Sequence, residues 1–273
     1  MQNYEKVFLV NIPLSVSDKR KDEPYMKIFD FQYFLNSFGV CMPYLLVTLE
    51  ILVISLFFSL LFGMFFAWCK LRKNHVVRIL ANTYTEIIRG TPFIVLLFII
   101  YFGIPKFMLS VMNISMDGVT KSVYIIVTLA MFGSARMSEA MRAAYLAVPS
   151  GQMEAALSVG ISPVQSFLSI VFPQALLIAI PNMGNLILSN LLETAVGFSI
   201  GIVDFVGNAR LVITRDYGVH SLEIYCIVAL VYWCMSMIMS KGFDLLESWL
   251  KKKQGLNPVR YGKNGRKGVA KHA

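Results

Sequence analysis

The longest apolar segment of the chain sets the strongest limit on its fold. Residues 51–69 (ILVISLFFSLLFGMFFAWC) are 19 consecutive residues without a charged side chain. As an α-helix at 1.5 Å rise per residue they would span roughly 28 Å, close to the hydrocarbon thickness of a bilayer. Only 15% of the 273 residues are charged and 56% are hydrophobic, too few charges to cover a soluble domain of this size. We therefore expect an all-α integral membrane protein. The composition excludes an ordinary soluble enzyme, a secreted disulfide scaffold and a disordered chain.

Four more segments are apolar enough to cross a membrane. The predicted spans are a first helix from near Pro43 through residue 69, then 90–105 with its helix beginning before Arg89, 122–148, about 174–193 and about 222–240. Charged stretches or proline and glycine separate these segments, which is how successive helices are usually delimited. The expected fold is a bundle of about five transmembrane helices.

The distribution of lysine and arginine predicts the orientation of the bundle. The loop 70–78 holds four such residues and the tail 251–273 holds eight, with no acid in either segment. Short basic segments next to spans stay in the cytoplasm. Five spans then put the N-terminus outside and the C-terminus in the cytoplasm. The net charge of +9 is mostly a property of the tail, so we interpret it as a topology marker or a lipid-headgroup contact rather than as a nucleic-acid site.

The chain divides into three parts. Residues 1–42 form an N-terminal segment with an aromatic, amphipathic helix near 29–38 that suits the membrane interface. Residues 43–250 form the transmembrane domain, and 251–273 form a basic cytoplasmic tail that we expect to be disordered. Met26 is an alternative to Met1 as the start of the chain. The four cysteines and three histidines are scattered, so we expect no metal site, and no phosphate-binding loop or catalytic constellation is visible.

The connector 149–173 (PSGQMEAALSVGISPVQSFLSIVFP) has the local signals of a helical hairpin. Good helix formers fill 152–159, and Gly160 follows where a C-terminal residue with positive φ is wanted. Ser162 and Pro163 then match an N-cap and a first helical position, with Gln165 completing a capping box. A second short helix should run to Val171. Pro173 should then restart the chain into the fourth span.

The hairpin is unusually apolar for a loop. It contains one acid and no base, and we expect it to expose the apolar side chains of Met153, Leu157, Val159, Ile161, Phe167 and Leu168. An apolar patch without cover usually marks an interface. The alternative is that the hairpin lies on the membrane or packs against its own bundle.

The same residues resemble a known signature. Glu154-Ala155-Ala156, three residues, Gly160, nine residues, Ile170, two residues and Pro173 resemble the EAA motif of ATP-binding cassette (ABC) importer permeases, with Phe172 where leucine is usual. The resemblance implies the type I importer permease fold. It also implies that Glu154, Ala155, Ala156, Gly160, Ile170 and Pro173 couple the membrane helices to a separate ATPase.

A second block resembles the polar amino acid branch of that family, the histidine, glutamine and cystine type. It comprises 84–92 (YTEIIRGTP), 101–105 (YFGIP), Gly184-Asn185 and Glu193-Thr194. Leu96, Leu192, Glu193 and Ala195 depart from the residues usual there, at positions near the substrate pathway of relatives.

The resemblance implies a permease subunit of an ATP-driven importer in the bacterial cell membrane. Residues 152–160 and 202–204 favour cystine or a related sulfur amino acid as substrate. The implied partners are a cytoplasmic ATPase, a second permease chain that is identical or different, and an extracytoplasmic solute-binding protein. ATP and Mg are expected on the ATPase, with no cofactor in this chain. The alternative is a secondary transporter or channel that works without an ATPase.

Polar residues in the fourth span are candidates for the substrate pathway. Asn182, Asn185 and Ser189 are three and four residues apart, so they share one helix face. They face either a polar pathway or a neighbouring helix. Glu193, near the outer end, suits a substrate ammonium group or a solvated helix end.

Charged residues near the second and third spans are candidates for structural ion pairs. They are Glu86, Arg89, Arg136, Glu139 and Arg142. Arg136, Glu139 and Arg142 follow at three-residue steps, which stacks them along one helix face. We favour an ion-pair network over substrate contact for this set.

Overall fold

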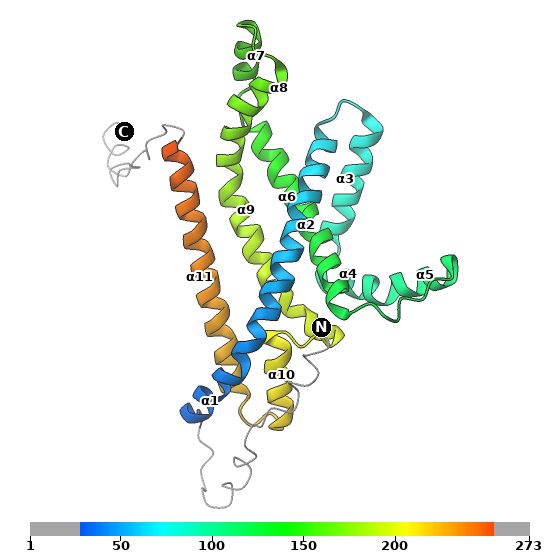
Figure 1. The fold of residues 1–273 in the computed structure, drawn as a ribbon, viewed down its shortest axis with the longest axis vertical. Helices are drawn as coiled ribbons and strands as arrows, with labels where there is room; N and C mark the ends of the chain where they lie inside the picture. Colours follow the sequence, from blue (N-terminus) through cyan, green and yellow to red (C-terminus); the bar gives the residue numbers. More distant parts are fainter. Residues whose placement is uncertain (1–27, 254–273) are drawn as a thin grey trace, which may run out of the picture.

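The computed structural model describes residues 28–253, and within that range all regular structure is helical. The α-helices are α1 (Phe31–Cys41), α2 (Leu45–Leu71), α3 (His75–Gly90), α4 (Phe93–Phe98), α5 (Ile104–Met112), α6 (Lys121–Leu146), α7 (Ser150–Ser158), α8 (Pro163–Ser166), α9 (Phe172–Thr194), α10 (Phe205–Arg215) and α11 (Ser221–Lys253). The expectations about Met1, Met26 and most of the basic tail lie outside the described residues. The molecule is elongated, with α2, α6, α9 and α11 running along its length (Figure 1).

Short irregular turns join several of these helices into longer ones. A 3₁₀ turn at Met42–Tyr44 joins α1 to α2, and π-helical turns at Ile99–Gly103 and Phe167–Val171 join α4 to α5 and α8 to α9. Within the described range, four helices are long and apolar enough to cross a membrane: Phe31–Leu71, Phe93–Met112, Pro163–Ile200 and Ser221–Lys253. Four of the five predicted spans thus correspond to membrane-compatible helices.

The remaining predicted span, the third (122–148), corresponds to α6, whose composition is too polar for it to count among these four helices. Its 26 residues would reach roughly 39 Å, enough for a bilayer. It lies at the centre of the bundle, packed against α2 on one side and α9 on another. Neighbouring helices, rather than lipid, therefore cover its polar side chains. That α6 crosses the membrane, and the orientation of the termini, stay predictions.

The second predicted span begins later than expected. The prediction that its helix starts before Arg89 was wrong, because α3 ends at Gly90 and α4 starts at Phe93. Thr91 has extended backbone angles (φ −98°, ψ 131°). The ring of Pro92 disfavours helical angles in the residue before it, and so separates the two helices.

Pro173 does not interrupt the helix, so the expectation that the chain restarts there into a separate span was wrong. Helical structure continues from Pro163 through Thr194, and the N–H of Phe172 bonds to the carbonyl of Phe167, five residues back. The wider turn accommodates the proline ring, which in a regular helix would collide with the carbonyl four residues back. The second helix of the hairpin and the fourth span therefore form one continuous helix.

The last helix is longer than the predicted span 222–240. It continues through Lys253, so three residues assigned to the basic tail form its final turn. Lysines in a last helical turn interact favourably with the helix dipole.

Two buried apolar clusters hold the bundle together. One joins α4 and α6 through Leu97, Ile125 and Leu129. The other joins α10 and α11 through Phe205 and Ile227, at the end of the molecule opposite the hairpin (Figure 1). This packing leaves α7 and α8 beyond the ends of the other helices.

Candidate functional site

The capping residues predicted from the sequence make the hydrogen bonds that shape the hairpin. The N–H of Gly160 bonds to Leu157 O at 3.0 Å, and the N–H of Ile161 bonds to Ala156 O at 3.1 Å. These two bonds form a Schellman motif, which needs a left-handed residue at its centre. Gly160 has φ +85° and fulfils that need without strain. Ser162 Oγ then accepts the N–H of Gln165 at 3.4 Å and starts α8.

The EAA residues lie on both faces of the first hairpin helix. Glu154 and Ala155 are exposed, whereas Ala156 is buried. Ile170 and Pro173 are half-buried where the second helix of the hairpin enters α9. The site therefore offers one carboxylate beside small and apolar side chains.

Apolar side chains of the hairpin point to solvent. Val159 is 75% exposed, Val164 69% and Leu168 57%, and Leu157 is also exposed. Met153, Ile161 and Phe167 are half-buried. The hairpin lies at the same end of the molecule as the α2–α3 connection and the end of α11 (Figure 1). An exposed apolar surface at the tip of a projecting arm suits contact with another protein.

Tryptophan–cation pairs mark the same end of the bundle. The guanidinium of Arg72 lies 3.9 Å from the centre of the Trp68 ring, and the ammonium of Lys253 lies 5.2 Å from that of Trp249. Tryptophan and basic residues gather at membrane–water interfaces. The hairpin extends beyond the ends of α2 and α11 in Figure 1.

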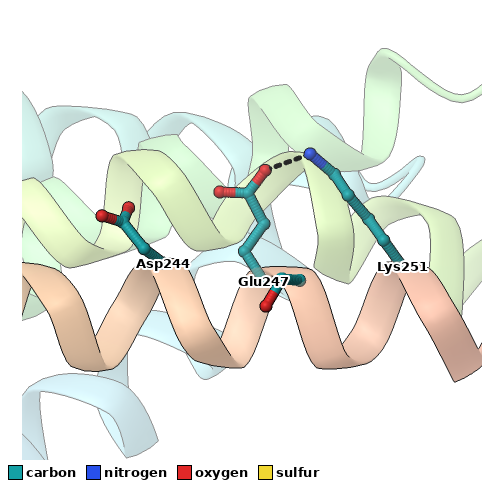
Figure 2. Close-up of a pocket in the computed structure, with 4 residues that line it drawn as sticks. Asp244, Glu247 and Lys251 are labelled. Carbon is teal, nitrogen blue, oxygen red and sulfur yellow. Dashed lines mark hydrogen bonds and ion pairs between the residues drawn. The ribbon is translucent and has the colours of Figure 1, made fainter. Parts of the chain in front are cut away.

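Charged side chains also line an open hollow near the end of α11. Figure 2 shows Asp244, Glu247 and Lys251 on one face of the helix, with Glu247 and Lys251 in an ion pair. The hollow measures about 230 Å³, and its lining residues all come from this one helix. It is a surface groove, and none of the predicted site residues lines it.

Arg136 connects α6 to α9. Its Nη1 donates to Glu193 Oε1 at 3.1 Å and to Ser189 Oγ at 3.3 Å, and its Nη2 donates to Asn190 Oδ1 at 2.8 Å. The guanidinium also lies 4.6 Å from the centre of the Phe132 ring. Arg136, which we predicted to form structural ion pairs, thus contacts two residues predicted to line the substrate pathway, Ser189 and Glu193.

The cluster around Arg136 has unused hydrogen-bonding capacity. Arg136 Nε, Glu193 Oε2 and Asn190 Nδ2 are buried and have no hydrogen-bond partner within the described part of the chain. Sequence reasoning did not select Asn190 as a site residue. Its place one residue after Ser189, in an uncharged span, was the available signal. Buried polar atoms of this kind normally bind water or another ligand.

Asn182 and Asn185 lie apart from that cluster. Both are exposed on α9, and neither makes a side-chain hydrogen bond with another described residue. Between them, Gly184 packs closely against Phe243 of α11. The polar face predicted for the fourth span is thus divided. Ser189 accepts a hydrogen bond from Arg136, whereas Asn182 and Asn185 are exposed.

The remaining charged candidates divide into two groups. Glu139 Oε2 contacts Arg142 at 3.0 Å, and Glu139 Oε1 contacts Lys70 Nζ at 2.5 Å. Glu86 and Arg89 are exposed on α3 and form no ion pair with another described residue. The structure does not bring these two together with Arg136, Glu139 or Arg142.

Lys70 is a site residue that the sequence analysis missed. Its side chain is 1% exposed and also donates to Ser138 Oγ at 3.1 Å. We expected it in the loop 70–78 because it directly follows the uncharged residues 51–69. In the structure, α2 continues to Leu71 and carries Lys70 against α6.

These features define the class of protein: a helical membrane protein with an exposed apolar hairpin at one end and a charged seam between two central helices. The family of binding-protein-dependent transport system inner membrane components matches residues 59–252, and the chain belongs to this family. It is a non-catalytic, membrane-embedded permease subunit of an amino acid ABC importer.

Individual relatives agree with this assignment. The chain is 37% identical to the L-cystine transport system permease protein TcyL of Bacillus subtilis, over 84% of this chain and 94% of TcyL. It is 30% identical to the probable amino-acid ABC transporter permease protein PatM of Vibrio harveyi, over 82% of this chain and 97% of PatM.

Solved structures share the fold. A crystal structure of an amino acid ABC transporter with histidines matches with a TM-score of 0.71 and 29% identity, over 82% of this chain and all of that one. The MetNI methionine ABC transporter matches at 18% identity with a TM-score of 0.58, which shows the likeness of fold alone.

Proposed function

We propose that this permease imports cystine or a related sulfur amino acid, and that the hairpin 149–173 couples it to a separate ATPase. The observation that carries the coupling proposal is the projecting, apolar hairpin with Glu154 and Ala155 exposed. A loop in water gains nothing from exposed Val159 and Leu168 unless a partner covers them.

The proposed assembly has four kinds of component. Two permease chains, identical or different, span the membrane with their N-termini outside and their C-termini in the cytoplasm. A cytoplasmic ATPase binds ATP and Mg and receives the hairpins, and an extracytoplasmic binding protein delivers the amino acid. This chain contributes no cofactor. ATP binding shifts the bundle between two states by acting on the hairpin, and substrate affinity differs between those states.

The proposed pathway runs along α9, past Asn182, Asn185, Ser189 and Glu193. Glu193 Oε2 is unpaired among the described residues and suits a substrate ammonium group. Arg136 Nε is likewise unpaired and suits a carboxylate. An amino acid zwitterion carries both an ammonium and a carboxylate group. Glu193 and Arg136 together therefore match its two charges.

Cystine is favoured by the 37% identity to the L-cystine permease TcyL. The first test is a mild-detergent purification of the tagged chain from its native membrane, read by mass spectrometry. Recovery of an ATPase and a binding protein is expected. The binding protein is then titrated with cystine, glutamine, arginine and histidine, and tightest binding of cystine is the expected result.

The alternative, a transporter that works without an ATPase, makes different predictions. Gly160→Asp places a side chain and a charge at φ +85° in the hairpin. Coupling predicts that this variant inserts into the membrane but loses the ATPase. A matched Gly151→Asp variant changes a hairpin glycine that lacks positive φ and should retain more of the ATPase. Gradient-driven uptake by the chain alone would favour the alternative.

A further inference from the structure

The joint between the hairpin and α9 is irregular and has a specific side-chain contact across it. Gln152 is in the first turn of α7, and Gln174 is in the first turn of α9. Gln174 Nε2 donates to Gln152 Oε1, and also to the backbone carbonyl of Ile170 at 2.8 Å. Both hydrogens of one amide group are therefore used, one toward each side of the joint.

The backbone at this joint lacks the regular hydrogen bonding of an α-helix. Residues Phe167–Val171 form a π-helical turn, and Pro173 has no N–H to donate. Turns of this kind bend helices and are frequent at functional sites. Without a contact across it, the turn would let the hairpin swing relative to α9.

Apolar contacts also attach the hairpin, and they are less directional. α7 packs against α8 and the π-helical turn. The Tyr145 ring at the end of α6 lies 6.1 Å from that of Phe167, which lies 6.0 Å from Phe172. Such rings hold the arm in place but can slide, whereas a hydrogen bond fixes distance and direction.

We infer that Gln152 and Gln174 are positioning residues that make α7 and α9 move as one body. This inference rests on the proposed coupling to an ATPase. A displacement of α7 then passes through the amide pair to the first turn of α9. From there the rigid helix carries it to Ser189 and Glu193.

The test measures transport per ATP hydrolysed, in proteoliposomes containing the chain, its ATPase and its binding protein. Gln152→Leu and Gln174→Leu keep approximate size but remove the amide. Each should retain the ATPase and hydrolyse ATP, while transport per ATP falls at least threefold. The double variant should be no worse than either single variant, because both remove the same contact.

A rescue pair separates positioning from folding. Gln152→Glu with Gln174→Lys restores an acceptor on α7, and the introduced ammonium has enough donors for both the new carboxylate and Ile170 O. This pair should regain most of the transport per ATP. Gln32→Leu is the matched control, since its side chain is exposed on α1, at the end of the molecule opposite the hairpin (Figure 1). This change should leave the ratio near that of the wild type.

Three results would overturn the inference: an unchanged ratio in both single variants, additive losses in the double variant, or loss of the ATPase from the complex. Failure of the proposed function itself looks different. In that case the unaltered chain would show no ATP hydrolysis that responds to the binding protein.

Discussion

Arg136 on α6 and Glu193 on α9 form an ion pair with 3.1 Å between Nη1 and Oε1, with each side chain less than one-fifth exposed. The pair joins two helices at the centre of the bundle, and Asn190 and Ser189 complete the shell of the guanidinium. Removing one member leaves the other partly buried without its counter-charge, which is costly.

Glu193→Gln should therefore destabilise the protein by about 1–3 kcal/mol, as for residues coupled in one network. Arg136→Met alone should cost a similar amount. The double variant should lose less than the sum, because neither charge is left unpaired. Thermal melting in detergent measures all three. Strictly additive losses would contradict the energetic coupling of the pair.

Gly133 lets three helices approach closely. A Cβ at this position would lie 2.3 Å from Ser59 Oγ of α2 and 2.7 Å from Asn190 Nδ2 of α9. Gly133→Ala should destabilise the bundle by about 1–3 kcal/mol through overpacking. Gly242→Ala on α11 is the control, since a Cβ there meets nothing within 4 Å and alanine favours helix. Equal melting temperatures for both variants would refute the close-approach argument.

The Lys70–Glu139–Arg142 group predicts an asymmetric response. Glu139→Gln leaves the buried Lys70 without an anion and should cost about 3 kcal/mol. Lys70→Met removes the buried charge itself, and Glu139 keeps Arg142 at 3.0 Å, so the cost should be below about 1 kcal/mol. Melting of the two variants side by side measures the difference. A larger loss from Lys70→Met would show that the lysine, not the carboxylate, organises the group.

The hairpin was predictable because its signals are local. Gly160 as the left-handed residue and Ser162 as the N-cap each depend on a few neighbouring residues, and both appear in the structure as expected. Helix existence in the apolar segments was predictable for the same reason, since length and hydropathy decide it.

Residue spacing predicted one ion pair along α6, Glu139 with Arg142, but not the ion pairs between helices. Arg136 and Glu139 are three residues apart, which suggests a pair along α6. In the structure Arg136 turns to α9 and Glu139 to Lys70 of α2, because α6 lies between those two helices. Which helix a charge faces is a property of the packed bundle. The π-helical turn before Pro173 was also missed. Proline alone is expected to break a helix, and here the helix continues only because the wider turn accommodates the proline ring.

Asp204 gives a pH-dependent prediction. It caps α10, outside the four membrane-compatible helices, and burial raises its pKa from 3.8 to about 6. The native chain thus binds this proton more tightly than the unfolded chain. The resulting stabilisation is complete below pH 3.8 and is lost as the pH rises through about 6.

Asp204→Asn should remove this pH dependence. The amide oxygen can still accept the N–H of Gly207, which lies 2.8 Å from Asp204 Oδ1. At pH 8 the variant should be more stable than the wild type by up to about 3 kcal/mol, the equivalent of the pKa change. At pH 5 the difference should shrink to about half. The same difference in melting temperature at both values would contradict the raised pKa.

Gly160 tests whether the shape of the hairpin, rather than its apolar surface, is what matters. At φ +85° a β-branched side chain is strained, whereas asparagine adopts left-handed angles more readily. Gly160→Val should strain the turn by about 1–2 kcal/mol and open the Schellman motif. Gly160→Asn should have a smaller effect. Since a Cβ at this position meets nothing within 4 Å, crowding inside the chain cannot explain a difference. Proteolysis of the purified chain at the hairpin should be faster for valine than for asparagine, and retention of the ATPase should fall in the same order. Equal retention by both variants would mean that docking depends on the exposed side chains and tolerates a deformed turn.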